Sequence, residues 1–162
     1  MIYRSKAPLR IGLAGGGTDV SPYSDQFGGA ILNATISLSA YATIEPLAEN
    51  KIIVEALDRN EQQSFDLLPL LPIDGTLDLL KGVYNRIQKD HSTSLPGFRL
   101  STFVDAPAGS GLGTSSTLVV AVLGAFKEML KLPLDEYKIA QYAYDIERND
   151  LQLAGGKQDQ YA

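Results

Sequence analysis

The sequence predicts an α+β domain, and three observations support that fold class. The 162 residues have an ordinary globular composition, with 44% hydrophobic and 20% charged residues, which is typical of a packed domain. Strand-like segments fill the first third of the chain, and a helix, a strand and two further helices follow. That order lacks the regular alternation of strand and helix that builds a parallel sheet. We expect one domain over residues 1–162, because a chain of this length can bury its own core.

The first third of the chain is expected to be β-rich. Residues 4–14 alternate in polarity and then run into a glycine cluster, which indicates a strand followed by a turn. Residues 30–47 contain one long strand around 38–46. A second strand is predicted over 51–57, with a turn at Glu49-Asn50 between the two.

Helical spacing dominates the rest. Apolar side chains recur at helical intervals over 76–90, and 98–104 alternates as a strand. A glycine-rich loop over 106–113 precedes a helix over 114–131, which Pro133 ends. A further helix is predicted from Asp135, a good N-cap, to Arg148. The last residues, 155–162, are expected to be a loop that enters a strand, so the chain stops within a motif and is expected to be a fragment of something longer.

Composition excludes several function classes. The chain has no cysteine and a single histidine, His91, which excludes thiolate zinc sites, cysteine nucleophiles and histidine-cluster metal sites. The net charge of −5 argues against nucleic-acid binding. No apolar run approaches the ~18 residues of a membrane span, and the basic N-terminus is no signal peptide. We therefore expect a cytoplasmic protein with neither nucleic acid nor membrane as partner.

The strongest local motif is the loop over 105–117, which follows a predicted strand and opens a predicted helix. Its three alternating glycines let the backbone approach a ligand and turn N–H groups inward, and the helix N-terminus adds positive charge. Hydroxyl groups at 114–116 could bind Mg²⁺. The loop is not a Walker P-loop, a dinucleotide fingerprint or a nucleophile elbow. The competing interpretation is a Gly/Ser loop that caps a core helix.

Two further clusters carry charged side chains. Arg10 lies in an apolar strand, where its charge requires an anion, and Asp19 follows three glycines, where a carboxylate could accept from sugar hydroxyls. The alternatives are an exposed edge position for Arg10 and a turn cap for Asp19. Glu147 shares a predicted helix face with alanines and an aromatic residue, and Asp159 lies in a glycine-led loop. Their alternatives are a solvated helix end and a turn.

Read together, the clusters are what a small-molecule kinase needs. Phosphoryl transfer to a hydroxyl needs a loop that holds phosphate and a carboxylate that binds the substrate's hydroxyl groups. It also needs a carboxylate that binds a metal ion and a carboxylate that accepts the proton.

Two motifs also resemble a known superfamily. Residues 106–116, APAGSGLGTSS, are similar to the ATP-phosphate loop of GHMP kinases, the superfamily of galactokinase, homoserine kinase and mevalonate kinase, with Thr114 in place of the first serine. Residues 7–19, APLRIGLAGGGTD, resemble the first motif of its sugar-binding members. The resemblance implies the N-terminal GHMP domain, with a fold like ribosomal protein S5 domain 2.

The resemblance also implies roles for individual residues. Asp159 would be the catalytic base, with Arg10 beside it to steady developing charge, and Ser115 would bind Mg²⁺ together with Glu147. Gly16, Gly17, Thr18 and Asp19 would bind the sugar, as would Asp159. The ATP-binding residues would be Pro107, Ala108, Gly109, Ser110, Gly111, Leu112, Gly113, Thr114, Ser115 and Ser116.

The implied reaction is transfer of phosphate from ATP to a sugar. Galactokinases have Glu-His where this chain has Gly16-Gly17, which suggests a different sugar. Residues 4–19 and the ending GGKQDQY are most similar to kinases that phosphorylate D-glycero-D-manno-heptose 7-phosphate at its anomeric C1 hydroxyl, for nucleotide-activated heptose in surface glycans. A kinase for L-fucose or a related sugar, a catalytically silent sugar sensor and a plain interaction domain are the alternatives.

Three points stay open from the sequence. The phosphate of a phosphorylated sugar needs a cationic side chain to bind it, and the sequence does not distinguish among Lys157, Lys6 and Arg4 for this role. GHMP kinases have a C-terminal domain that closes over the substrate, so the 162 residues alone are expected to have little or no kinase activity. A homodimer is also an expectation.

Overall fold

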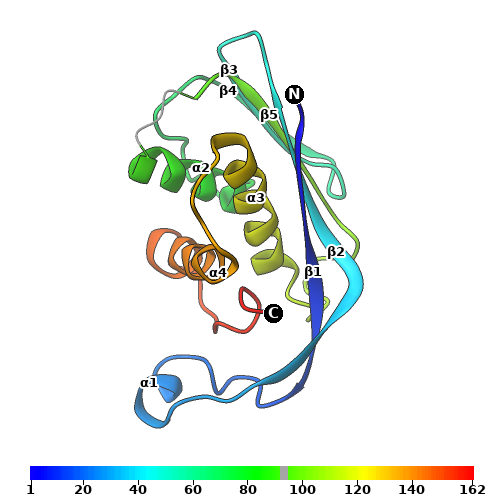
Figure 1. The fold of residues 1–162 in the computed structure, drawn as a ribbon, viewed down its shortest axis with the longest axis vertical. Coiled ribbons are helices and arrows are strands. Elements are labelled where there is room, and N and C mark those ends of the chain that lie inside the picture. The colour runs from blue at the N-terminus through cyan, green and yellow to red at the C-terminus, as the bar shows by residue number, and fades with distance from the viewer. Residues whose placement is uncertain (92–94) are drawn as a thin grey trace.

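The computed structural model describes residues 1–91 and 95–162. Within them, five strands form one sheet, and three of the helices cover one of its faces (Figure 1). The strands are β1 (Tyr3–Ala14), β2 (Leu32–Pro46), β3 (Lys51–Ala56), β4 (Glu61–Asp66) and β5 (Phe98–Val104). The helical segments are α1 (Tyr23–Phe27), α2 (Asp78–His91), α3 (Thr114–Leu130), α4 (Glu136–Asp145) and the π-helical η1 (Ile146–Asp150). The α+β fold class is confirmed.

The sheet has the order β1-β2-β5-β3-β4. β5 enters between β2 and β3, antiparallel to the first and parallel to the second. The chain does bend at 48–50, as expected from Glu49-Asn50, but the two strands that it joins pair with β5 and not with each other. β4 was not expected, because it is mostly polar and only Phe65 packs against the core.

The helices of the second half match their expected positions. α2 and α3 lie where the apolar spacing predicts them, and the Asp135 carboxylate caps α4 by accepting from the Lys138 backbone N–H at 2.8 Å. α4 ends at Asp145, and the expected last turn is the π-helical η1 instead. Residues 155–162 form no strand among those described, so that expectation is wrong. None of the described helices is long and apolar enough to cross a membrane.

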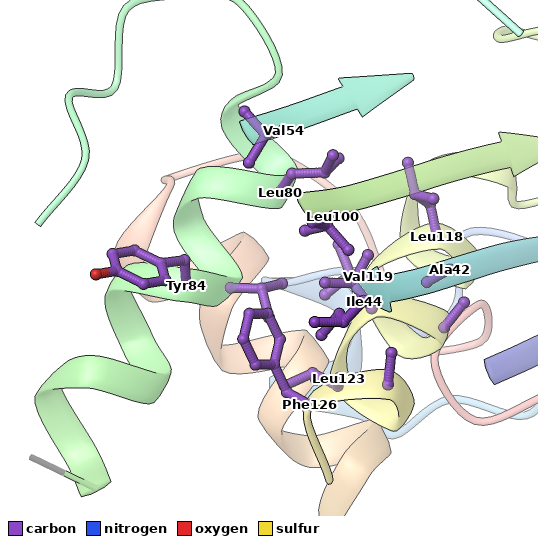
Figure 2. Close-up of a cluster of buried hydrophobic side chains, with 14 of the residues drawn as sticks. Ala42, Ile44, Val54, Leu80, Tyr84, Leu100, Leu118, Val119, Leu123 and Phe126 are labelled. Carbon is purple, nitrogen blue, oxygen red and sulfur yellow. The ribbon is translucent and has the colours of Figure 1, made fainter. Parts of the chain in front are cut away.

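A single hydrophobic core fills the space between the sheet and α2–α3 (Figure 2). Ile44 of β2, Leu100 of β5 and Phe126 of α3 are completely buried there. Each such side chain contributes about 1.5–3 kcal/mol by leaving water. The core therefore fixes α3, and with it the loop that precedes this helix, against the middle of the sheet.

A β-bulge sets the side of β1 on which Arg10 lies. The β1–β2 pairing shifts register between Pro8 and Arg10, so that Leu9 and Arg10 are both buried although they are adjacent. A regular strand would send neighbouring side chains to opposite faces. Arg4 and Lys6, before the bulge, are exposed. The bulge thus turns Arg10 toward the start of α3, and the chain's C-terminal end lies there too (Figure 1).

Candidate active site

The glycine-rich loop joins the end of β5 to the first turn of α3. Its alternating glycines adopt the left-handed region, with φ of 80° at Gly109, 75° at Gly111 and 78° at Gly113. A side chain at Gly109 or Gly111 would meet nothing within 4 Å, so the backbone conformation alone calls for glycine there. The loop backbone is bare on its outer side, beside the positive end of a 17-residue helix. This geometry suits an anion.

Arg10 fastens this loop to β1. Its backbone N–H donates to the carbonyl of Leu112 at 3.2 Å, and its Nη1 donates to the carbonyl of Gly111 at 2.6 Å. Nε donates to Oδ1 of Asp159 at 2.7 Å, and Nη2 forms an ion pair with the same oxygen. The interpretation of Arg10 as an exposed edge residue is wrong, since only 8% of the residue is exposed. Its buried charge has the anionic partner that such a position requires.

Asp159 lies directly against the start of α3. A side chain at Gly113 would come within 3.1 Å of the Asp159 carboxyl carbon, a tight contact, and the left-handed φ of this residue also favours glycine. One carboxylate oxygen, Oδ1, is occupied by Arg10, while Oδ2 accepts no hydrogen bond from the described residues. The side chain is one-quarter exposed. Asp159 therefore presents a free carboxylate oxygen beside the glycine-rich loop.

Asp19 holds the segment that carries Asp159. Its Oδ2 accepts from the backbone N–H groups of Lys157 at 2.6 Å and Gln158 at 2.9 Å. A side chain at Gly156 would come within 1.9 Å of this oxygen. Oδ1 is buried and has no partner among the described residues. Asp19 thus keeps one buried carboxylate oxygen that has no hydrogen-bond partner among the described residues.

The other expected sugar-binding residues form the turn before Asp19. Thr18 makes the turn bonds that a capping Asp19 would have made: its Oγ1 donates to the carbonyl of Gly15 at 2.7 Å and accepts from the Ala30 N–H at 3.1 Å. Gly16 and Gly17 are exposed, with open space around them. The turn-cap interpretation of Asp19 is therefore wrong, because Thr18 closes the turn and Asp19 reaches across to the chain end.

Glu147 is buried with two hydrogen-bond donors. Only 2% of the residue is exposed, and its carboxylate accepts from Ser116 Oγ at 2.9 Å and from Gln160 Nε2 at 2.5 Å. Burial raises the pKa of Glu147 above its usual range, whereas the two donors and the Arg148 guanidinium oppose that rise. The solvated-helix-end interpretation is wrong, because Glu147 lies in η1 on the side that also carries the buried Ala143 and it bonds to Ser116 of α3.

The serine beside Glu147 is Ser116. Ser115, which the family resemblance pairs with Glu147, is exposed and lines a separate pocket beside the loop. Successive residues on a helix point about 100° apart, so Ser115 and Ser116 face different sides of α3. The remaining lining residues of that pocket are Asp58, Arg59, Leu79, Val104, Ala106, Ala108, Thr114 and Leu118.

Comparison with known proteins identifies the family. Residues 78–162, more than half of the chain, match the GHMP kinases N terminal domain. The chain belongs to the GHMP kinase family. It is 52% identical to a D-glycero-alpha-D-manno-heptose 7-phosphate kinase from Campylobacter jejuni, over 98% of this chain and 47% of the relative. An L-fucokinase/L-fucose-1-P guanylyltransferase from Bacteroides fragilis is 30% identical, over 96% of this chain and 19% of that protein.

Solved structures agree with this GHMP assignment. A D-glycero-D-manno-heptose 1-phosphate kinase from Bacteroides thetaiotaomicron superposes with a TM-score of 0.95 and 57% identity, covering all of this chain and 53% of that one. Lactococcus lactis galactokinase, crystallised with galactose, has a TM-score of 0.83 at 22% identity, over 99% of this chain and 41% of that one, and shows the fold alone. The GHMP chain described here spans about half the length of the curated heptose kinase that it matches.

Two parts of this GHMP site were not found from the sequence. Gln160, which bonds to Glu147 and Ser116, is one of three glutamines near the chain end, and no periodicity there distinguishes a buried side chain from an exposed one. The pocket residues Asp58 and Arg59 lie after β3 in a stretch without any motif. Only the pairing of β3 with β5 brings them beside the loop.

Proposed function

We propose that this chain forms the ATP- and sugar-binding part of a kinase that phosphorylates the anomeric hydroxyl of D-glycero-D-manno-heptose 7-phosphate. The products are the 1,7-bisphosphate and ADP. One observation carries the proposal: Asp159 lies against the glycine-rich loop, paired with Arg10 through Oδ1 and open at Oδ2. A base next to a phosphate cradle is the arrangement that phosphoryl transfer to a hydroxyl requires.

The chemistry follows from these contacts. The anomeric hydroxyl would donate its proton to Oδ2 of Asp159 as its oxygen forms a bond to the γ-phosphorus of ATP. The bond between that phosphorus and the bridging oxygen breaks, and ADP leaves. The backbone N–H groups over 109–114 would hold the phosphate oxygens. Arg10 keeps Asp159 in place and supplies positive charge where negative charge develops.

Mg²⁺ fits the polar pair beside the loop. Ser116 Oγ and the Glu147 carboxylate are hard oxygen donors, and Mg²⁺ is commonly held by one or two carboxylates together with substrate phosphates. When bound, the ion would neutralise charge on the transferred phosphoryl group. Ser115, one residue earlier, would instead contact the nucleotide from the adjoining pocket, where Arg59 and Leu79 would meet its ribose and base.

We propose Lys157 as the cation for the sugar's own phosphate. Its backbone is anchored by Asp19, two residues before the proposed base, and its Nζ lies 5.3 Å from the centre of the Tyr144 ring. It forms no ion pair with the residues described. Arg4 and Lys6 are poorer candidates because they lie earlier on β1, before the bulge that turns Arg10 toward Asp159.

Two relatives favour different sugars. The heptose kinase is much more similar to this chain than the fucokinase is, so heptose 7-phosphate is the first choice and L-fucose the second. The cytoplasmic location and the homodimer stay predictions.

A sugar panel tests the proposal. The complete gene product would be incubated with Mg-ATP and one of heptose 7-phosphate, heptose 1-phosphate, unphosphorylated heptose, L-fucose or galactose, and ADP release would be followed. We expect turnover with heptose 7-phosphate to exceed that with the other sugars. Preferred turnover of L-fucose would support the second choice, and ADP release with none of the sugars would overturn both.

A further inference from the structure

The Gln160 side chain forms hydrogen bonds only with Ser116 and Glu147 among the described residues. The residue is 4% exposed, and its amide Nε2 donates to Ser116 Oγ at 3.1 Å and to Glu147 Oε2 at 2.5 Å. Its Oε1 is buried as well and accepts no hydrogen bond from the described residues. Both amide hydrogens are therefore spent on the Ser116–Glu147 pair, and the side chain has no other polar contact in this part of the chain.

The preceding residue reaches a different part of the fold. Asp159 bonds to Arg10 on β1, whereas Gln160 bonds to the first turn of α3 and to η1. These two adjacent residues thus connect three elements that are far apart in the sequence. The proposed base and the proposed metal-binding oxygens are linked through one peptide unit and one buried amide.

We propose that Gln160 is a positioning residue that fixes Asp159 relative to Glu147 and Ser116. This inference rests on the proposed function. Without the Gln160 amide, the segment over 157–160 would keep its contacts with Asp19 and Arg10 and the neighbouring Arg148–Gly156 hydrogen bond, but it would lose its side-chain hydrogen bonds to Ser116 and Glu147. Proton transfer and in-line attack depend on tightly held geometry, and a displacement of about 1 Å costs on the order of 100-fold in rate.

An amide suits this position better than a carboxylate. The two oxygens that Gln160 meets belong to a hydroxyl and to a carboxylate, and an amide donates to both without adding negative charge. Glutamate at 160 would place a second carboxylate beside Glu147, where like charges repel. Methionine would match the length of glutamine and keep the packing while removing the donors.

The test compares Gln160→Met and Gln160→Asn with Tyr161→Phe in the complete gene product. Tyr161 is the next residue, and its hydroxyl donates to the exposed Gln141 at 2.9 Å, so Tyr161→Phe removes a neighbouring hydrogen bond outside the site. We expect kcat to fall about 100-fold in both Gln160 variants, with a rise of at most about tenfold in the KM for Mg-ATP and with wild-type kinetics in Tyr161→Phe. Saturating Mg²⁺ should not restore kcat, because Asp159 is displaced as well.

A second readout does not depend on turnover. Mn²⁺ binding in the presence of ADP, followed by electron paramagnetic resonance, should weaken about tenfold in Gln160→Met, because residues that hold metal ligands in place typically contribute about 10–100-fold to metal affinity. Wild-type kcat and wild-type Mn²⁺ affinity in a folded Gln160 variant would overturn the proposal, and so would full recovery of kcat at saturating Mg²⁺. A wild-type protein that phosphorylates no sugar would instead refute the proposed function.

Discussion

The Arg10 guanidinium donates to the Asp159 carboxylate at 2.7 Å, although the two residues are 149 positions apart in the sequence. The same guanidinium donates to the carbonyl of Gly111. One buried side chain therefore joins β1, the glycine-rich loop and the chain end. The three motifs of the sequence become one site through this residue.

Replacing Arg10 with lysine should destabilise the fold. A lysine ammonium is a point donor and cannot serve both Asp159 and Gly111 in the fixed geometry of a guanidinium. Breaking a buried ion pair costs about 3 kcal/mol, and we expect the free energy of unfolding of Arg10→Lys, measured in urea, to fall by roughly 2–3 kcal/mol. An unfolding midpoint equal to that of the wild type would show that the contacts of Arg10 add little.

Gly156→Ala should disrupt the hold of Asp19 on the chain end. The new methyl group would lie 1.9 Å from Asp19 Oδ2, the oxygen that binds the Lys157 and Gln158 amides. Thermal unfolding of the complete gene product should begin at lower temperature, by several degrees for each lost kcal/mol. Gly16→Ala is the matched control, because nothing lies within 4 Å of its added methyl. Equal melting temperatures for the two variants would contradict the account of Asp19.

Lys157→Ala should weaken binding of a phosphorylated sugar selectively. A hydrogen bond to a charged group is worth about 1.5–3 kcal/mol, so the KM for heptose 7-phosphate should rise at least about tenfold. The KM for unphosphorylated heptose should not change. Lys6→Ala, on the exposed side of β1, is the control and should leave both values unaltered. A selective effect in Lys6→Ala would reverse the choice between these cations.

The raised pKa of Glu147 predicts a pH dependence of stability. The folded protein retains the proton of Glu147 to higher pH than the unfolded chain, whose carboxyl has the ordinary value of 4.5. Stability is therefore lost as the pH rises from about 4.5 through the folded pKa, and the loss is complete above it. Without metal ions, the unfolding free energy of the wild type should fall relative to Glu147→Gln over this range. If the difference in unfolding free energy between the wild type and Glu147→Gln stays constant from pH 4 to 8, this prediction is contradicted.

Much of the fold could be predicted because its signals are local. The strand over 98–104 and the starts of α3 and α4 depend on alternation, apolar spacing and caps within a few residues. The order of the strands depends on distant pairing, and nothing within 51–57 indicates that β5 separates this strand from β2. β4 was missed because an edge strand with one inward aromatic residue lacks clear alternation.

The sequence predicted which residues form the site better than it predicted which of them contact one another. The φ values of Gly109, Gly111 and Gly113 agree with the backbone role expected of them. Ser116 rather than Ser115 meets Glu147, because Ser116 lies on the buried side of α3 and Ser115 on the exposed side. A one-residue shift of this kind depends on packing between two helices, which sequence spacing does not record.

The central claim is that Asp159 removes the proton from the sugar hydroxyl at a phosphate cradle. Asp159→Asn keeps the size of the side chain and its bond with Arg10 through the amide oxygen, but removes the base. The measurement is turnover of heptose 7-phosphate by the complete gene product, together with Mg-ATP affinity by calorimetry. The account predicts a loss of turnover of at least about 100-fold with nearly unchanged ATP affinity, whereas turnover close to that of the wild type would contradict it.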